Sequence, residues 1–287
     1  MKLKIFEPRC KHRHTKDEHP QCFPMDLKNT GDRVPNILIL DIETAPMEVF
    51  VWGLKNNDYI PPSNVIHDYF ILSWSAKWLM ETTVVGLSVP RWDATKRDDK
   101  KILPILWTAL DNADIVIAHN GKQFDLKKIN SRFLLNGFPP PRPYEVIDTL
   151  TICRSIFGFS SNALNYLNKI LGLDLKVETG GMDLWKKCLA GDQESLDKLL
   201  SYNKNDVVIL EELYMVLRPW IKSHPNVGLY MDLETPVCRN CGSSELAMNG
   251  YITTPVGRYQ SVRCKCGAVG RLKVNSLTKA KKKSLVV

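Results

Sequence analysis

Residues 37–44, ILILDIET, decide the fold class of this 287-residue chain. Four apolar residues in a row are typical of a buried strand, and the acids that follow mark the point where it emerges. Side chains alternate along a strand, so Asp41 and Glu43 project from the same face, roughly 6.5 Å apart along the chain. Two carboxylates held this close repel each other, and a divalent cation between them removes that cost. The stretch therefore predicts an acidic, metal-binding pair at the end of a buried strand.

A tyrosine and another acid share one side of a long predicted helix between Gln193 and Leu217. Within this segment leucines recur at helical spacing and predict one buried face; they are Leu196, Leu199, Leu210, Leu213 and Leu217. Tyr202 and Asp206 are four residues apart, so they lie on the same side of the helix, beside that apolar stripe. The pattern therefore predicts that the Tyr202 phenol and the Asp206 carboxylate project in the same direction from the edge of the core.

Together with residues 120–125, NGKQFD, these segments resemble the three motifs of the DnaQ-like 3′–5′ exonucleases, the DEDD group of the RNase H-like superfamily. Residues 41–43, DIE, match the first motif, and residues 120–125 are similar to the second motif of family-B DNA polymerase proofreading domains. Tyr202-x3-Asp206 matches the third motif in its tyrosine form, DEDDy. The histidine form expects histidine at position 201, which is Ser201 here. The ordered set, over about residues 35–221, is more specific than any one motif.

The resemblance implies a two-metal phosphodiesterase site. Asp41 would bridge two Mg²⁺ or Mn²⁺ ions, while Glu43 and Asp206 would complete the site of the ion that activates water. Asp125 would hold the second ion. Tyr202 would orient the nucleophilic water, because a phenol with a pKa near 10 is a poor general base at pH 7.

Direction and polymer type follow from the family and not from these residues. The resemblance implies release of nucleotides from 3′ ends, in DNA that is single-stranded or frayed, with Asn120 helping to position the substrate and Phe124 expected in the core. An exoribonuclease or a structure-specific nuclease of the same fold is one alternative. A non-catalytic nucleic-acid-binding protein is another. No polymerase palm is present, so a DNA polymerase or other replication protein is a candidate partner, and the layout is similar to RNase H-like exonucleases of bacteriophages with a terminal ribbon.

The order of elements between the motifs predicts an α/β fold with an RNase H-like mixed β-sheet flanked by helices. A helix is expected at 103–110, and strands are expected at 36–43, 70–77, 83–89, 114–118 and 144–148. In such a sheet, three antiparallel strands are extended by parallel ones, and helices cover both faces.

Composition divides the chain into four expected parts: a basic, Cys/His-rich segment at 1–34, an exonuclease domain at 35–225, a zinc-ribbon module at 226–275 and a basic tail at 276–287. No apolar run approaches the ~18 residues that cross a bilayer, and the N-terminus lacks the apolar core of a secretory signal. We therefore expect a cytoplasmic protein, in the host cytoplasm if the source is viral, with no membrane partner. In a reducing compartment, its eight cysteines predict metal binding in preference to disulfides.

The ribbon is predicted from Cys238-x2-Cys241 and Cys264-x-Cys266, which offer four thiolates to a structural Zn²⁺. Residues 251–254 and 259–263 are the expected hairpin strands between them. The second pair departs from the usual CxxC spacing, so its turn must be tighter or its geometry imperfect. A module this small buries little apolar surface and should be unfolded without metal.

Positive charge is concentrated at the C-terminal end. The chain has a formal charge of +8, and residues 236–287 hold ten Lys or Arg against one acid, which leaves −1 for the remainder. Five basic residues of the predicted ribbon are candidates for nucleic-acid binding: Arg258, Arg263, Lys265, Arg271 and Lys273. A ribbon that docks a protein is the alternative, and the lysines at 279–283 fit a solvated tail equally well.

The N-terminal segment offers a candidate for a second zinc site. Five ligand-type residues occur within thirteen positions, and a Cys2His2 set would use Cys10, His12, His19 and Cys22, with His14 as a further ligand. The spacing matches no standard zinc finger, and a mobile basic arm is the alternative.

Overall fold

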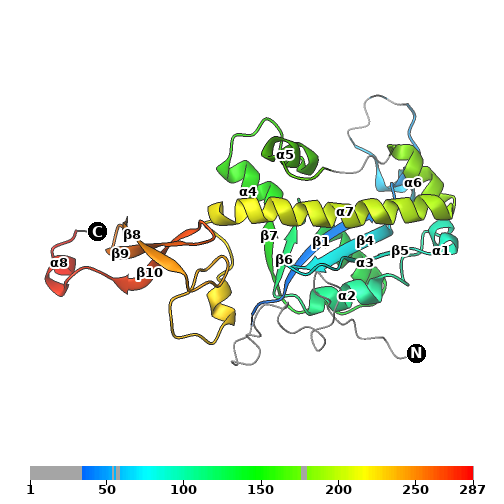
Figure 1. Cartoon of the computed structure of the whole chain (residues 1–287). Coiled ribbons are helices and arrows are strands. Elements are labelled where there is room, and N and C mark those ends of the chain that lie inside the picture. The colour runs from blue at the N-terminus through cyan, green and yellow to red at the C-terminus, as the bar shows by residue number, and fades with distance from the viewer. Residues whose placement is uncertain (1–33, 54, 56–58, 176–179, 287) are drawn as a thin grey trace, which may run out of the picture.

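A five-stranded mixed sheet forms the centre of the molecule (Figure 1). The computed structural model describes residues 34–53, 55, 59–175 and 180–286. The strand order is β5-β4-β1-β6-β7. β4 pairs antiparallel with β1 and β5, and β6 runs parallel to β1 and β7. The strands are β1 (Ile37–Thr44), β4 (Ile71–Trp78), β5 (Val85–Ser88), β6 (Ile115–Ala118) and β7 (Glu145–Asp148). This is the predicted RNase H-like arrangement, with strand bounds within two residues of those expected.

β1 is buried because it has a strand on each side and helices on both faces. Leu38 and Leu40 pack into the cluster that contains the inner residues of α2 (Leu103–Asp111) and α3 (Asp125–Leu135). Ile37 and Ile39 alternate to the opposite cluster, which contains the C-terminal half of α7 (Gln193–Leu217). Asp41 and Glu43 continue the Ile37–Ile39 side, so both acids lie on the face of the sheet that α7 crosses.

α7 begins and ends at the predicted residues. The Asp192 carboxylate accepts from the Ser195 backbone N–H at 2.9 Å and caps its N-terminus. All five leucines of the predicted stripe are at most 2% exposed. The other helices of this region are α1 (Arg91–Thr95), α4 (Thr149–Ile156), α5 (Leu164–Leu171) and α6 (Met182–Leu189). Of the helices in the described ranges, none has the length and apolar character that crossing a membrane requires.

A small hairpin interrupts the path from β1 to β4. It consists of β2 (Glu48–Val49) and β3 (Val65–His67). Arg97 secures its base, because one guanidinium nitrogen donates to the Pro46 and Asp68 carbonyls and another pairs with Glu48. The sequence analysis did not predict this hairpin.

The C-terminal module is a three-stranded antiparallel sheet of order β10-β9-β8. Its strands are β8 (Leu246–Thr254), β9 (Gly257–Cys264) and β10 (Val269–Asn275). The predicted hairpin is confirmed, and β10 is an additional strand. Figure 1 shows this sheet beyond the C-terminal end of α7, followed by the short helix α8 (Lys279–Lys283) in the basic tail.

Candidate active site

Three of the predicted acids converge where α7 passes over the end of β1. Asp41 and Glu43 come from the strand, and Asp206 comes from the helix, where its side chain is 1% exposed. One carboxylate oxygen from each lies within 4.8 Å of the other two. Oxygens on opposite sides of one Mg²⁺ lie about 4.2 Å apart, so small side-chain rotations would bring all three onto one ion. The donor set therefore fits a hard divalent cation.

Asp125 approaches the same strand end from the other direction. It is the first residue of α3 and is 3% exposed. Its Oδ1 accepts a hydrogen bond of 3.2 Å from the backbone N–H of Ile42, the residue between Asp41 and Glu43. Asp125 is thus fixed next to the acidic pair, although its oxygens lie outside the three-carboxylate cluster.

The turn that leads into α3 is held by a residue that the sequence analysis did not single out. Asp148, 2% exposed at the end of β7, accepts 3.1 Å hydrogen bonds from the backbone N–H groups of Asn120 and Lys122. Asn120 has a positive φ of 70°, and a Cβ on Gly121 would lie 2.4 Å from the Cβ of Ala118. The Asn-Gly pair therefore permits the tight path that delivers Asp125. Asn120, predicted to contact nucleic acid, lies in this turn.

Tyr202 lies one turn before Asp206 on α7 and is half-buried. The next residue, Asn203, is fully buried and donates from Nδ2 to Oδ2 of Asp41 at 2.5 Å. The side-chain oxygen of Asn203, Oδ1, accepts a hydrogen bond of 3.3 Å from the Ser73 hydroxyl on β4. Asn203 therefore joins the helix to both strands at the acidic cluster.

A sequence signal for Asn203 exists in the apolar stripe of α7. Buried positions alternate at spacings of three and four, and Asn203 and Asp206 are its two polar members. A polar residue at a buried helix position needs a partner. Including Asn203 in the stripe would have identified it as a buried polar residue with a partner across the core.

Near the start of α3, a cation lies over two aromatic rings. Lys128, one turn along α3 from Asp125, places Nζ 3.5 Å from the centroid of the Tyr69 ring and 5.0 Å from that of Phe124. Burial lowers the pKa of Lys128, and the charge of Asp68 opposes this effect. Phe124 is 39% exposed, so its predicted core position is wrong. Its ring lies at the protein surface because Asp125 and Leu126 take the inward positions at the start of α3, one and two residues further along the chain.

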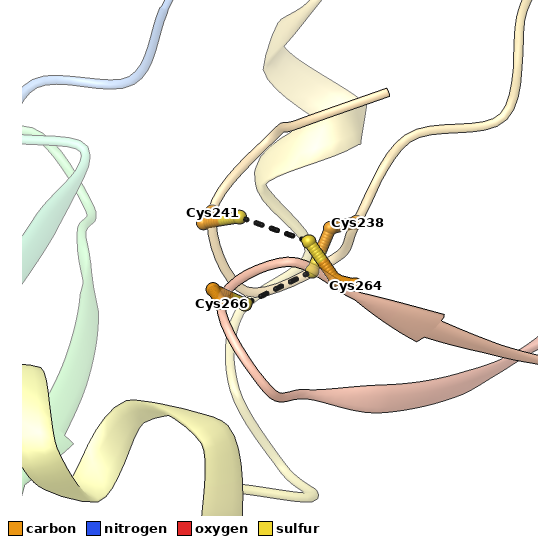
Figure 2. A group of neighbouring side chains, drawn as sticks. All are labelled: Cys238, Cys241, Cys264 and Cys266. Carbon is orange, nitrogen blue, oxygen red and sulfur yellow. Dashed lines mark hydrogen bonds between the residues drawn. The ribbon is translucent and has the colours of Figure 1, made fainter. Parts of the chain in front are cut away.

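Four cysteines form a second cluster that fits a metal (Figure 2). The Sγ atoms of Cys238 and Cys266 are 3.8 Å apart, and those of Cys241 and Cys264 are 3.5 Å apart. All four sulfurs lie within 4.8 Å of one another. A tetrahedral ion with Zn–S bonds of about 2.3 Å separates its ligands by about 3.8 Å. The tighter Cys264-x-Cys266 spacing still brings both sulfurs into this arrangement.

The thiols of this cluster share their protons. A hydrogen bond from the Cys241 thiol stabilises the thiolate of Cys238 and is the main cause that lowers the pKa of Cys238. The same interaction raises the pKa of Cys241. The lowered pKa favours the thiolate of Cys238, which is the form that binds metal.

The basic candidates of the ribbon are used in different ways. Arg258 stacks on Tyr251 with 4.8 Å between its guanidinium carbon and the ring centroid, and Arg271 stacks on Tyr259 at 3.9 Å. The other three basic residues have no ring contact of this kind. Arg263 donates to the Gly267 carbonyl at 3.2 Å, Lys265 pairs with Glu245, and Lys273 is exposed. The candidates of the N-terminal segment, Cys10, His12, His14, His19 and Cys22, lie outside the described residues.

Comparisons with known proteins agree with this fold. A model of the RNase H superfamily matches residues 82–218, a range that includes Asp125, Tyr202 and Asp206. The DNA polymerase III PolC-type of Ureaplasma parvum serovar 3 is 29% identical over 119 residues, or 42% of this chain. The match spans 8% of the length of that polymerase.

Among solved structures, the family B DNA polymerase of the hyperthermophilic archaeon Pyrobaculum calidifontis is similar, with a TM-score of 0.48 and 14% identity. The likeness covers 65% of this chain and 25% of the polymerase. Residues 82–218 thus match the RNase H superfamily, in agreement with the RNase H-like sheet described above.

Proposed function

We propose that the chain is a metal-dependent 3′–5′ exonuclease that hydrolyses phosphodiester bonds, with DNA as its polymer. The observation that carries the proposal is the convergence of Asp41, Glu43 and Asp206, whose oxygens lie within 4.8 Å of one another. Three clustered carboxylates repel each other strongly, and a fold keeps them together where divalent cations bind. The RNase H superfamily match supports a nuclease built on this fold.

In this proposal Asp41, Glu43 and Asp206 would hold one Mg²⁺ or Mn²⁺, and Asp41 and Asp125 would hold a second. When bound, two such ions supply positive charge to the phosphoryl oxygens and lower the pKa of a bound water. Asp125 would hold the second ion, and its hydrogen bond from the Ile42 backbone keeps its carboxylate beside the acidic pair.

Tyr202 orients the attacking water in this scheme. It projects from the same side of α7 as Asp206, one turn away, and is half-buried. A phenol donates or accepts a hydrogen bond at neutral pH without changing its charge, so it fixes the direction of attack. Asn203 positions Asp41, because its amide restrains the rotamer of that carboxylate.

The substrate proposed is single-stranded or frayed DNA at its 3′ end. A PolC-type DNA polymerase is among the similar proteins, which favours DNA and makes a polymerase or other replication protein a candidate partner. An exoribonuclease or structure-specific nuclease differs from this proposal in substrate alone. The four cysteines are proposed to hold a structural Zn²⁺.

The test uses end-labelled single-stranded DNA and RNA with Mg²⁺, Mn²⁺ or EDTA. We expect a ladder that shortens from the 3′ end, requires a divalent ion and disappears in Asp41→Asn. The matched control is Asp183→Asn, which removes an acid whose side chain is 81% exposed and should leave the ladder intact. Intact substrate under every ion, with binding retained, would instead support the non-catalytic nucleic-acid-binding protein.

A further inference from the structure

A single helix connects the acidic cluster to the C-terminal ribbon. Asp206 and the last residue of α7, Leu217, are separated by eleven helical steps. At 1.5 Å per residue this amounts to about 16 Å along the helix axis. α7 then continues directly into a 3-10 turn, Arg218–Trp220. The path from the site to the ribbon is therefore short and rigid.

The cysteine cluster is attached to that end of the helix. Asn240, between the first two cysteines and 3% exposed, donates from Nδ2 to the carbonyls of Arg218 at 2.7 Å and Ile221 at 3.2 Å. Arg239 donates to the His224 carbonyl at 2.5 Å. On the second cysteine turn, Gly267 lies against the Pro219 ring. These contacts fix the ribbon relative to α7, so it does not behave as a tethered appendage.

Both faces of the ribbon sheet present an arginine stacked on a tyrosine. Tyr251 pairs across β8 and β9 with Gln260, so Tyr251 and Arg258 share one face. Arg271 pairs with Ser261, which places it with Tyr259 on the opposite face. Arg258 and Arg271 are exposed. An arginine lying flat on a ring keeps its N–H edge directed outward, in the orientation that binds a phosphate.

The positive charge of the ribbon and tail favours a nucleic acid as the partner. Residues 236–287 carry +9, and the remaining residues sum to −1. A surface of this charge attracts the phosphate backbone of nucleic acids whatever the base sequence. Tyr251, which is 57% exposed, adds an aromatic ring of the kind on which single strands stack their bases.

We propose that the ribbon binds the nucleic-acid strand upstream of its 3′ end, at a distance set by α7. The inference rests on the proposed nuclease function, which places the 3′ end at the carboxylates. From there the strand passes about 16 Å of helix, and Arg258 lies up to about 20 Å further along β9. At about 3.4 Å per stacked nucleotide, contact with the ribbon requires roughly five to eleven nucleotides.

The experiment measures binding by the full chain carrying Asp41→Asn, so that no substrate is consumed. Fluorescence anisotropy gives the Kd for labelled single-stranded DNA of 4, 8, 12 and 16 nucleotides, with and without Arg258→Gln and Arg271→Gln. The two arginines lie on opposite faces, so a strand passing along one face contacts one of them. For 16-mers we therefore expect the slope of log Kd against log salt to fall by about 0.7, which corresponds to about 5-fold weaker binding at 0.1 M salt. For 4-mers, Kd should not change. If the double variant binds as much zinc per protein as the wild type, its ribbon is folded.

The matched control is Lys282→Gln with Lys283→Gln, which removes the same charge from the tail without touching either tyrosine. Equal losses in the two double variants, or a loss that does not depend on length, would overturn the proposal. Unaltered DNA binding would also overturn it and would favour a ribbon that docks a protein. If the wild-type chain hydrolyses nothing but the length-dependent loss is seen, the nuclease proposal fails while this one stands.

Discussion

Asn203 on α7 donates its side-chain amide to Oδ2 of Asp41 on β1, across a sequence separation of 162 residues. A carboxylate that accepts such a hydrogen bond is restrained in one rotamer, and its remaining lone pairs keep a fixed direction. The same amide accepts from Ser73, so the helix, β1 and β4 meet in one hydrogen-bonded group. The position of Asp41 therefore depends on α7 as well as on its own strand.

Replacing Asn203 should weaken catalysis without removing an acid. We expect Asn203→Ala to lower activity or metal affinity by about 10- to 100-fold, the usual effect of losing a group that orients a metal ligand. Mg²⁺ titration of the hydrolysis rate measures both quantities. Asn205→Ala, a half-buried neighbour whose amide bonds to Leu175, is the control. A titration curve identical to that of the wild type would show that Asn203 has no such role.

Removing a carboxylate from the cluster should separate activity from stability. In EDTA, Asp206→Asn should unfold at an equal or higher urea concentration than the wild type, because it relieves repulsion among three acids within 4.8 Å. Turnover should be nearly abolished. Mg²⁺ should stabilise the wild type, by about 2.7 kcal/mol at a hundred times its Kd, and should stabilise the variant less. A variant destabilised in EDTA would indicate a purely structural Asp206.

The path of the turn before α3 depends on a glycine. Gly121→Ala would place a Cβ 2.4 Å from Ala118 and so displace Asp125. We expect a clear loss of hydrolysis, since misplacing a reacting group by an ångström is costly. Gly158→Ala is the control, because a Cβ there meets no atom within 4 Å. Equal rates in the two variants would mean that the turn relaxes without moving Asp125.

The docking of the ribbon on α7 should contribute to stability through Asn240. Asn240→Ala leaves the buried carbonyls of Arg218 and Ile221 without this donor, and we expect a loss of about 1–3 kcal/mol in the free energy of unfolding. Urea denaturation followed by circular dichroism measures it. Ser244→Ala, on the exposed side of the same turn, should change stability by less than about 0.5 kcal/mol. Similar values for both would contradict the docking.

Thiol chemistry can count the metal-bound cysteines. Burial raises the pKa of Cys153 and Cys188 to about 11, so both remain protonated thiols at pH 8 and should react slowly with alkylating agents. Their reactivity should rise about tenfold per pH unit towards pH 11, because the thiolate is the reactive form. At pH 8, adding a chelator to the zinc-loaded protein should expose four further reactive thiols, because the ribbon is expected to unfold without its metal.

A gain of six thiols would mean that Cys10 and Cys22 also bind metal. A gain of none would contradict the cysteine site. The double variant Cys10→Ser with Cys22→Ser separates these outcomes, since it should still gain four if the site at Cys238–Cys266 binds zinc by itself.

The strands of the sheet and α7 were predictable because each rests on a local pattern, while the arrangement of the sheet followed from the RNase H-like order of elements. The apolar run before Asp41 identifies a buried strand, and the leucines of α7 recur over a length that chance seldom produces. The partner of Asn203 was not predictable in the same way. It depends on which strand the helix crosses, and the spacing along a helix fixes a face but not the residue opposite to it.

Other features escaped prediction because their signal is short or weak. β2 and β3 have two and three residues, too few for periodicity to be recognised. β10 has the sequence VGRLKVN, in which apolar and polar residues do not alternate regularly, so the sequence lacks the signal of a half-buried strand. The attachment of the ribbon rests on backbone carbonyls of Arg218 and Ile221, and a sequence does not encode carbonyl positions directly.

Because α7 is continuous from Asp206 to the end on which the ribbon docks, it fixes an angle as well as a length. One residue inserted between Leu210 and Leu213 would rotate everything beyond it by about 100° while moving it only about 1.5 Å. An insertion of seven residues would nearly restore the facing of the ribbon and lengthen the span by about 10 Å. Whether an insertion in this segment is tolerated should therefore depend on how close it comes to a whole number of helical turns, and less on how many residues it adds. Natural relatives with longer helices should differ in this segment by whole turns.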